Sequence, residues 1–129
     1  MVRKTTVHAL ALTALIVSST GAWAAGSANN APKAPEKFMT FCVPCHGPAG
    51  KGDGPAAAAL NPKPRDLTDG KYMNGRSDAQ LTNVIKNGSA AEKLSPMMTG
   101  YGSMLNDKEI KDVVAFIRLL AVPKYQPKK

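Results

Sequence analysis

Hydrophobic residues recur at helical spacing in three segments of the chain, and almost nowhere do they alternate with period two. The strongest pattern lies in 106–123, where six positions define one apolar face: Ile110, Val113, Val114, Ile117, Leu120 and Ala121. Asn106 and Glu109 are spaced to form a capping box at its start, and Pro123 is placed to end it. The pattern predicts an amphipathic helix near the C-terminus.

A second helix is predicted over 77–88, where three apolar residues share a face: Leu81, Val84 and Ile85. Ser77 and Gln80 fit a capping box, and Gly88 fits a left-handed helical cap. A third, shorter helix is expected over 35–41, where Phe38 and Phe41 lie three residues apart.

Long irregular segments separate these helices. The segments 46–76 and 89–105 are rich in glycine and proline and contain no periodic pattern. The predicted fold class is therefore all-α, with three main helices joined by long loops. Such helices offer little apolar material for a core, and long loops in a small domain usually wrap something. A large, flat, apolar cofactor would supply the missing interior.

The N-terminal 24 residues have the layout of a secretory signal peptide: a basic start, an apolar run from Val7 to Val17, and an Ala-Trp-Ala cleavage site ending at Ala24. The predicted organisation is a signal peptide, a flexible leader, a folded domain and a basic tail, over 1–24, 25–35, 36–122 and 123–129 respectively. We expect export to a bacterial periplasm, with no membrane span after cleavage.

Two of the chain's 17 Lys and Arg residues lie in the signal, which leaves 15 against 9 Asp and Glu, a net charge of +6. The lysines are dispersed and aromatic residues are few, so nucleic acid is a poor fit as partner. A solvated surface accounts for most of this charge. The more specific alternative is that the charge steers the protein towards an acidic partner. Four cations flank the two irregular segments and are candidates for a basic rim: Lys51, Lys63, Arg65 and Lys93.

The chemistry concentrates in Cys42-Val-Pro-Cys45-His46. A thioredoxin-type dithiol needs a strand before the motif and a helix after it, and neither is predicted here. A disulfide would close a very small loop and leave His46 unexplained, and structural zinc lacks a fourth ligand. Covalent attachment of a c-type haem uses all three residues, two as thioethers and one as the proximal iron ligand.

The residues alone leave the sixth ligand of the iron open. No second histidine remains after 1–24, so methionine and lysine are left. Five methionines are candidates, most of which are expected to be core fillers: Met39, Met73, Met97, Met98 and Met104.

The segments "CVPCHGPAGKGDGP", "LNPKPRDL", "LTNVIKNG" and "SPMMTGYGSMLNDKEIKDVVAFIRLL" resemble, in order and spacing, a class I bacterial cytochrome c. The resemblance implies a small cytochrome c fold wrapped around one covalently bound haem c. It also implies Met98 as the sixth ligand, since "MTGYG" matches a Met-Pro-x-aromatic-Gly run with Thr99 in place of proline. Met97 remains the alternative.

The same resemblance implies that a loop proline, Pro55 or Pro62, accepts the hydrogen bond of the far nitrogen of His46. Arg65 is a candidate to neutralise a haem propionate, or else a surface residue. The implied function is a soluble, monomeric periplasmic carrier of single electrons between redox proteins, and not an enzyme. The alternatives are a haem subunit of a larger oxidoreductase, and a haem ligand-binding or sensing protein with a labile methionine.

Overall fold

The computed structural model describes residues 32–126. The predicted signal peptide 1–24 lies outside this range, as do most of the leader and residues 127–129. Within it the chain is helical and contains no strand, only an isolated bridge between Asp69 and Val122. The elements in chain order are η1 (Phe38–Cys42), α1 (Val43–His46), η2 (Ala57–Ala59), α2 (Gly70–Met73), α3 (Asp78–Asn87), η3 (Ser89–Glu92) and α4 (Asp107–Leu120). The all-α prediction is confirmed.

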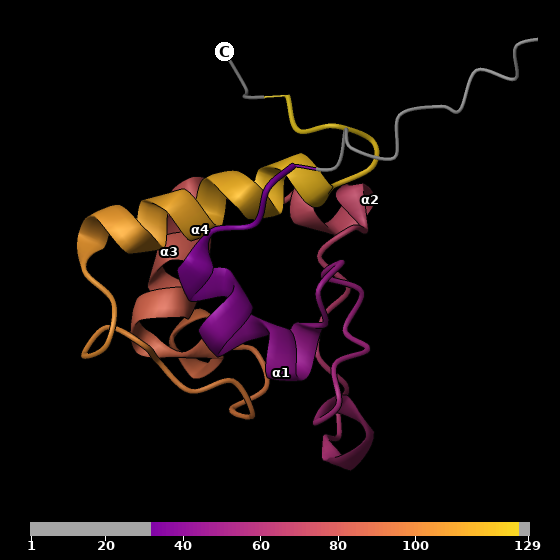
Figure 1. The fold of residues 1–129 in the computed structure, drawn as a ribbon, viewed down its shortest axis with the longest axis vertical. Helices are drawn as coiled ribbons and strands as arrows, with labels where there is room; N and C mark the ends of the chain where they lie inside the picture. The colour runs from indigo at the N-terminus through magenta and orange to yellow at the C-terminus, as the bar shows by residue number, and fades with distance from the viewer. Residues whose placement is uncertain (1–31, 127–129) are drawn as a thin grey trace, which may run out of the picture.

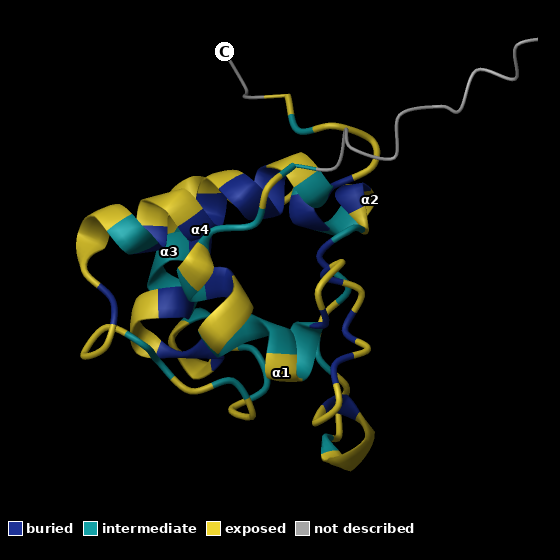
Figure 2. Cartoon of the chain, viewed as in Figure 1, coloured by how far each residue is buried: buried dark blue, intermediate teal, exposed yellow. Residues whose placement is uncertain are grey.

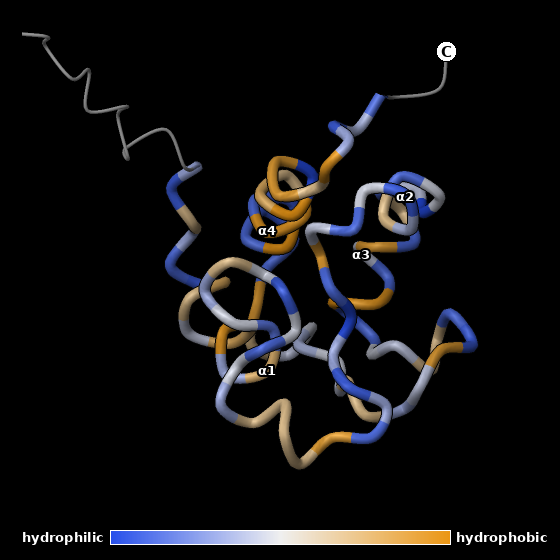
Figure 3. Tube along the Cα trace, turned by 90° about the vertical axis from the view of Figure 1, so that its right-hand side faces the viewer, coloured by the Kyte–Doolittle hydropathy of each residue, from blue (hydrophilic) through white to orange (hydrophobic). Residues whose placement is uncertain are grey.

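Helix α4 is the longest element and lies across one side of the molecule (Figure 1). The predicted capping box of Asn106 and Glu109 is present at its start. Its inner side is buried and its outer side exposed, as Figure 2 shows, and Figure 3 views the same helix nearly along its axis. Phe116, which the predicted face omitted, is buried as well.

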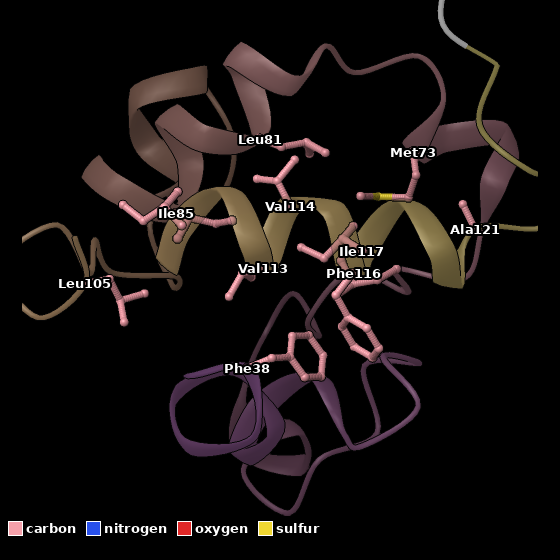
Figure 4. Close-up of a cluster of buried hydrophobic side chains, with 12 residues drawn as sticks. Phe38, Met73, Leu81, Ile85, Leu105, Val113, Val114, Phe116, Ile117 and Ala121 are labelled. Carbon is pink, nitrogen blue, oxygen red and sulfur yellow. The ribbon is translucent and has the colours of Figure 1, made fainter. Parts of the chain in front are cut away.

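The first helix is a π-helical turn, η1, that continues directly into α1. Phe38 on η1 is fully buried and meets the ring of Phe116 edge to face, with ring centroids 4.7 Å apart. Figure 4 shows the two rings side by side between η1 and α4. This contact fixes the start of the cysteine motif against the longest helix.

Helix α3 begins at the predicted capping box of Ser77 and Gln80. The left-handed helical cap predicted at Gly88 was wrong, because φ is 88° but ψ is 160°. A Cβ atom at Gly88 would lie 3.0 Å from the carbonyl oxygen of Met98. The glycine therefore permits both this backbone angle and the close approach of a later loop.

Helix α2 was not predicted, since its four residues are too few to show a period. A buried side chain of α4 holds it in place. The Arg118 guanidinium donates to the carbonyl oxygens of Met73 and Arg76, at 2.7 and 2.5 Å, and to a carboxylate oxygen of Asp78 at 2.8 Å. Arg118 thus joins α4 to the segment between α2 and α3.

No helix within residues 32–126 combines the length and apolar character needed to cross a membrane.

Candidate functional site

The cysteine motif is itself helical: Cys42 ends η1, and Cys45 and His46 lie in α1. Helix α1 ends with carbonyl groups that need partners. The following loop supplies amides to them, from Gly52 to His46 at 2.8 Å and from Gly54 to Cys45 at 3.1 Å. A Cβ atom at Gly54 would collide with the α1 backbone, so the loop can fold onto the motif only through glycine.

The His46 ring is held by a backbone carbonyl. Its Nδ1–H donates to the carbonyl oxygen of Arg65 at 3.0 Å, because a carbonyl only accepts. The expectation of Pro55 or Pro62 in this role was wrong. Leu67 N–H donates to the Gly50 carbonyl at 2.7 Å, which places the segment just after Arg65 beside the motif loop. The bond leaves Nε2 as the ring nitrogen available to a metal.

Burial sets the protonation of the motif. Burial lowers the pKa of His46, although the hydrogen bond to Arg65 opposes this, so the neutral ring that a metal requires is favoured. Burial, aided by Cys45, raises the pKa of the Cys42 thiol from 9.0 to about 11. A redox dithiol needs the opposite shift, towards a reactive thiolate. The structure therefore gives no support to thioredoxin-like chemistry.

A mostly apolar cavity of ≈ 290 Å³ lies among these elements. Cys42, Cys45 and His46 line it from one part of the chain, and Met98 lines it from another. Side chains of α3 and α4 complete the lining, including Leu81, Ile85, Val113 and Ile117. All four predicted site residues thus border one space, which suits a flat apolar group with a few polar attachment points.

The five candidate methionines occupy different positions. Met39 and Met104 are exposed and do not line the cavity. Met73 lines the cavity but is 3% exposed and belongs to the core, where Figure 4 shows it beside Ile117. Met97 borders the cavity with 46% of its surface exposed, whereas Met98 is half-buried and packs against the core.

The Met98 loop is attached to the end of α3 by its backbone. Tyr101 N–H donates to the Ile85 carbonyl at 2.8 Å, and Gly102 N–H donates to the Lys86 carbonyl at 2.9 Å. A Cβ atom at Gly100 would lie 2.6 Å from that Lys86 oxygen. Glycine therefore lets the loop lie directly on the helix backbone.

Two arginines and a tyrosine border the cavity beyond His46. The Arg65 guanidinium lies over the Tyr72 ring, 4.0 Å from its centroid, and Arg76 donates to the Tyr72 hydroxyl at 3.1 Å. Sequence reasoning identified Arg65 but missed Tyr72 and Arg76, because no motif or spacing singled them out.

The chain is similar to several known proteins. The cytochrome c family model matches residues 31–121. The cbb3-type cytochrome c oxidase subunit FixP of Azorhizobium caulinodans is 29% identical over 104 residues, which is 81% of this chain but only 32% of that protein. The chain therefore spans about a third of this relative's length.

Two solved structures share the fold. The c-type cytochrome KustC0563 has a TM-score of 0.51 and 23% identity, with coverage of 65% of this chain and 92% of that one. A chain of the Kuenenia stuttgartiensis reducing HAO-like protein complex Kustc0457/Kustc0458 has a TM-score of 0.58 and 21% identity, with coverage of 75% and 48%. The chain belongs to the cytochrome c family and, with Cys42 and Cys45 in a Cys-x-x-Cys-His motif, carries one covalently bound haem c.

Proposed function

We propose that this cytochrome c is an exported, freely diffusing carrier of single electrons, in which His46 and Met98 are the two axial iron ligands. The observation that carries the proposal is the shared cavity, which brings the attachment motif and the anchored Met98 loop to one space. Met/His ligation raises a haem's potential and leaves the iron no open position, so the haem supplies electron transfer without binding substrate.

Met98 is favoured over Met97 by its surroundings. The Met98 carbonyl accepts a hydrogen bond from the Ser89 amide at 3.1 Å, and its side chain contacts the core. The Met97 side chain is about half exposed at the cavity border. A ligand must keep its place when the iron changes charge, and the more firmly held residue suits that task.

The two arginines at the other border suit the haem's acidic groups. The guanidinium groups of Arg65 and Arg76 lie 4.0 and 5.3 Å from the Tyr72 ring centroid, and a guanidinium binds a carboxylate in a bidentate manner. We assign Arg65 and Arg76 to the haem propionates.

The distribution of ion pairs favours docking of an acidic redox partner near the cavity. The four ion pairs found among residues 32–126 each include a residue of α4. The cations of the basic rim take part in none of these pairs, and all are exposed: Lys51, Lys63, Arg65 and Lys93. Of these four, Lys63 and Arg65 border the cavity. Because a propionate would neutralise Arg65, the three lysines are the cations that would steer an acidic partner towards the haem and make the encounter sensitive to salt.

An optical redox titration of the holoprotein, followed by carbon monoxide on the same reduced sample, tests the proposal. A methionine-ligated carrier is expected to titrate as one electron and to bind carbon monoxide slowly and weakly. Fast, tight binding at neutral pH would instead support a sensing or ligand-binding role with a labile methionine.

A second candidate function is a haem subunit of a larger oxidoreductase. The similarity to FixP, of which the chain spans 32%, favours this candidate. Native purification separates the two: a monomer that exchanges electrons with several partners supports the carrier, and a stable complex supports the subunit.

A further inference from the structure

Ser89 is a buried polar residue, and electron transfer by itself does not explain why a polar side chain is buried there. It begins η3, is 6% exposed, and borders the cavity. Within residues 32–126, Ser89 and Arg118 are the two buried residues with polar or charged side chains. Arg118 joins three helical segments, whereas the partners of Ser89 all lie within residues 93–98, in the loop that carries Met98.

Ser89 holds the segment 95–98 at both ends. Its backbone N–H donates to the Met98 carbonyl at 3.1 Å. Its hydroxyl lies within hydrogen-bonding reach of the Ser95 carbonyl, and 3.3 Å from the Met98 carbonyl. A hydroxyl has one proton to donate, and the Ser95 oxygen is the nearer acceptor. One residue thus binds the first and last carbonyls of this segment.

The short helix η3, which Ser89 begins, is also fixed in place. The Glu92 carboxylate, at the other end of η3, accepts from the Asn83 amide at 2.6 Å and from the Gln80 amide at 3.3 Å. Leu94 N–H donates back to the Ser89 carbonyl at 3.1 Å. Gln80 and Asn83 lie on α3, so these bonds fix η3, and with it Ser89, to that helix. The later part of the loop, at Tyr101 and Gly102, is bonded to the same helix.

Because both ends of the segment 95–98 are held, its residues have little freedom to shift along the chain direction. The chain is also held on either side of this segment, because Leu94 N–H donates to the Ser89 carbonyl and Tyr101 N–H donates to the Ile85 carbonyl. With those points fixed, moving Met97 to the place of Met98 would pull the Ser95 and Met98 carbonyls away from Ser89. Met97 has 46% of its surface exposed at the cavity border, while Met98 packs against the core.

We infer that Ser89 is a positioning residue that selects Met98, and not its neighbour Met97, as the sixth ligand of the iron. The inference rests on the proposed ligation by Met98. Ser89 would act through the loop, by its hydrogen bonds to the Ser95 and Met98 carbonyls.

The test compares Ser89→Ala with Ser89→Thr, which keeps the hydroxyl, and with Ser103→Ala, an exposed serine in the same loop region. Imidazole is titrated into each ferric holoprotein while the methionine-to-iron charge-transfer band is followed. We expect Ser89→Ala to lose the band at about fivefold less imidazole than wild type, as befits one lost hydrogen bond. Ser89→Thr and Ser103→Ala should stay near the wild-type midpoint. Circular dichroism checks that every variant is folded.

A second pair of variants tests selection directly. Met98→Leu should abolish the band, whereas Ser89→Ala/Met98→Leu should regain part of it through Met97. Ser89→Ala titrating like Ser103→Ala, or no band returning in the double variant, would overturn the role of Ser89. A wild-type protein without the band, or a Met98→Leu protein that keeps it, would overturn the ligand assignment as well. Both of these results come from proteins that keep Ser89, so a wrong ligand assignment can be told apart from a wrong role for Ser89.

Discussion

Adding one methyl group at Gly100 should loosen the Met98 loop. A Cβ atom there would lie 2.6 Å from the Lys86 carbonyl oxygen and 2.7 Å from the Asn87 carbonyl carbon, both backbone atoms that cannot rotate away. The loop must therefore move off α3. The clash costs about 1–3 kcal/mol, and weakening the two hydrogen bonds of Tyr101 and Gly102 costs about 1 kcal/mol each. We expect Gly100→Ala to destabilise the holoprotein by about 3 kcal/mol.

The matched control is Gly75→Ala. Gly75 is exposed, and a Cβ atom there would meet one atom, the Tyr72 carbonyl oxygen, at 3.3 Å. Both changes restrict the unfolded chain equally, by about 0.4–1 kcal/mol, so their difference isolates the clash. Guanidinium unfolding gives the free energies, and the methionine-to-iron band reports the loop. A Gly100→Ala protein within about 0.5 kcal/mol of the control, with an unchanged band, would refute the reasoning.

Three further predictions address the core and the cofactor. Phe38→Ala, which empties a fully buried site, should lower the unfolding free energy by about 3–5 kcal/mol in a denaturant titration. Arg118→Met should lower the unfolding free energy by about 2–4 kcal/mol, because two backbone carbonyls lose their donor. Asp78→Asn changes a side chain that is 62% exposed and should cost less than about 1 kcal/mol. Equal costs for the two variants would contradict the role given to the Arg118 guanidinium. Cys42→Ala/Cys45→Ala, which prevents covalent attachment, should lose most of the helical circular dichroism signal, and a fully helical haem-free protein would contradict this.

The sequence predicted what depends on short-range spacing. The capping boxes at Ser77 and Asn106 and the apolar face of α4 follow from local rules, and the structure confirms them. The attachment motif was equally visible, because its two thiols and its imidazole fall within five consecutive residues, 42–46. These features need no knowledge of distant segments.

The features that sequence reasoning missed depend on how distant segments meet. The hydrogen bond to His46 comes from the backbone of Arg65, and any residue at that position presents the same carbonyl. Gly88 was assigned a left-handed cap because glycine often has one, but the approach of the Met98 loop determines its conformation. Ser89 carried no signal at all, since its partners lie six to nine residues later in an irregular loop.

The central cavity has a consequence for how the protein matures. At about 24 cal/mol per Å³, an enclosed void of ≈ 290 Å³ would cost about 7 kcal/mol. This cavity is partly open to solvent, so that figure is an upper bound, but it is of the order of the whole stability of a small domain, about 5–15 kcal/mol. A chain without its cofactor is thus poised near unfolding, open to proteases and accessible at both thiols. Attachment then acts as the step that completes the fold, and resistance of the chain to an added protease becomes a readout of successful haem loading.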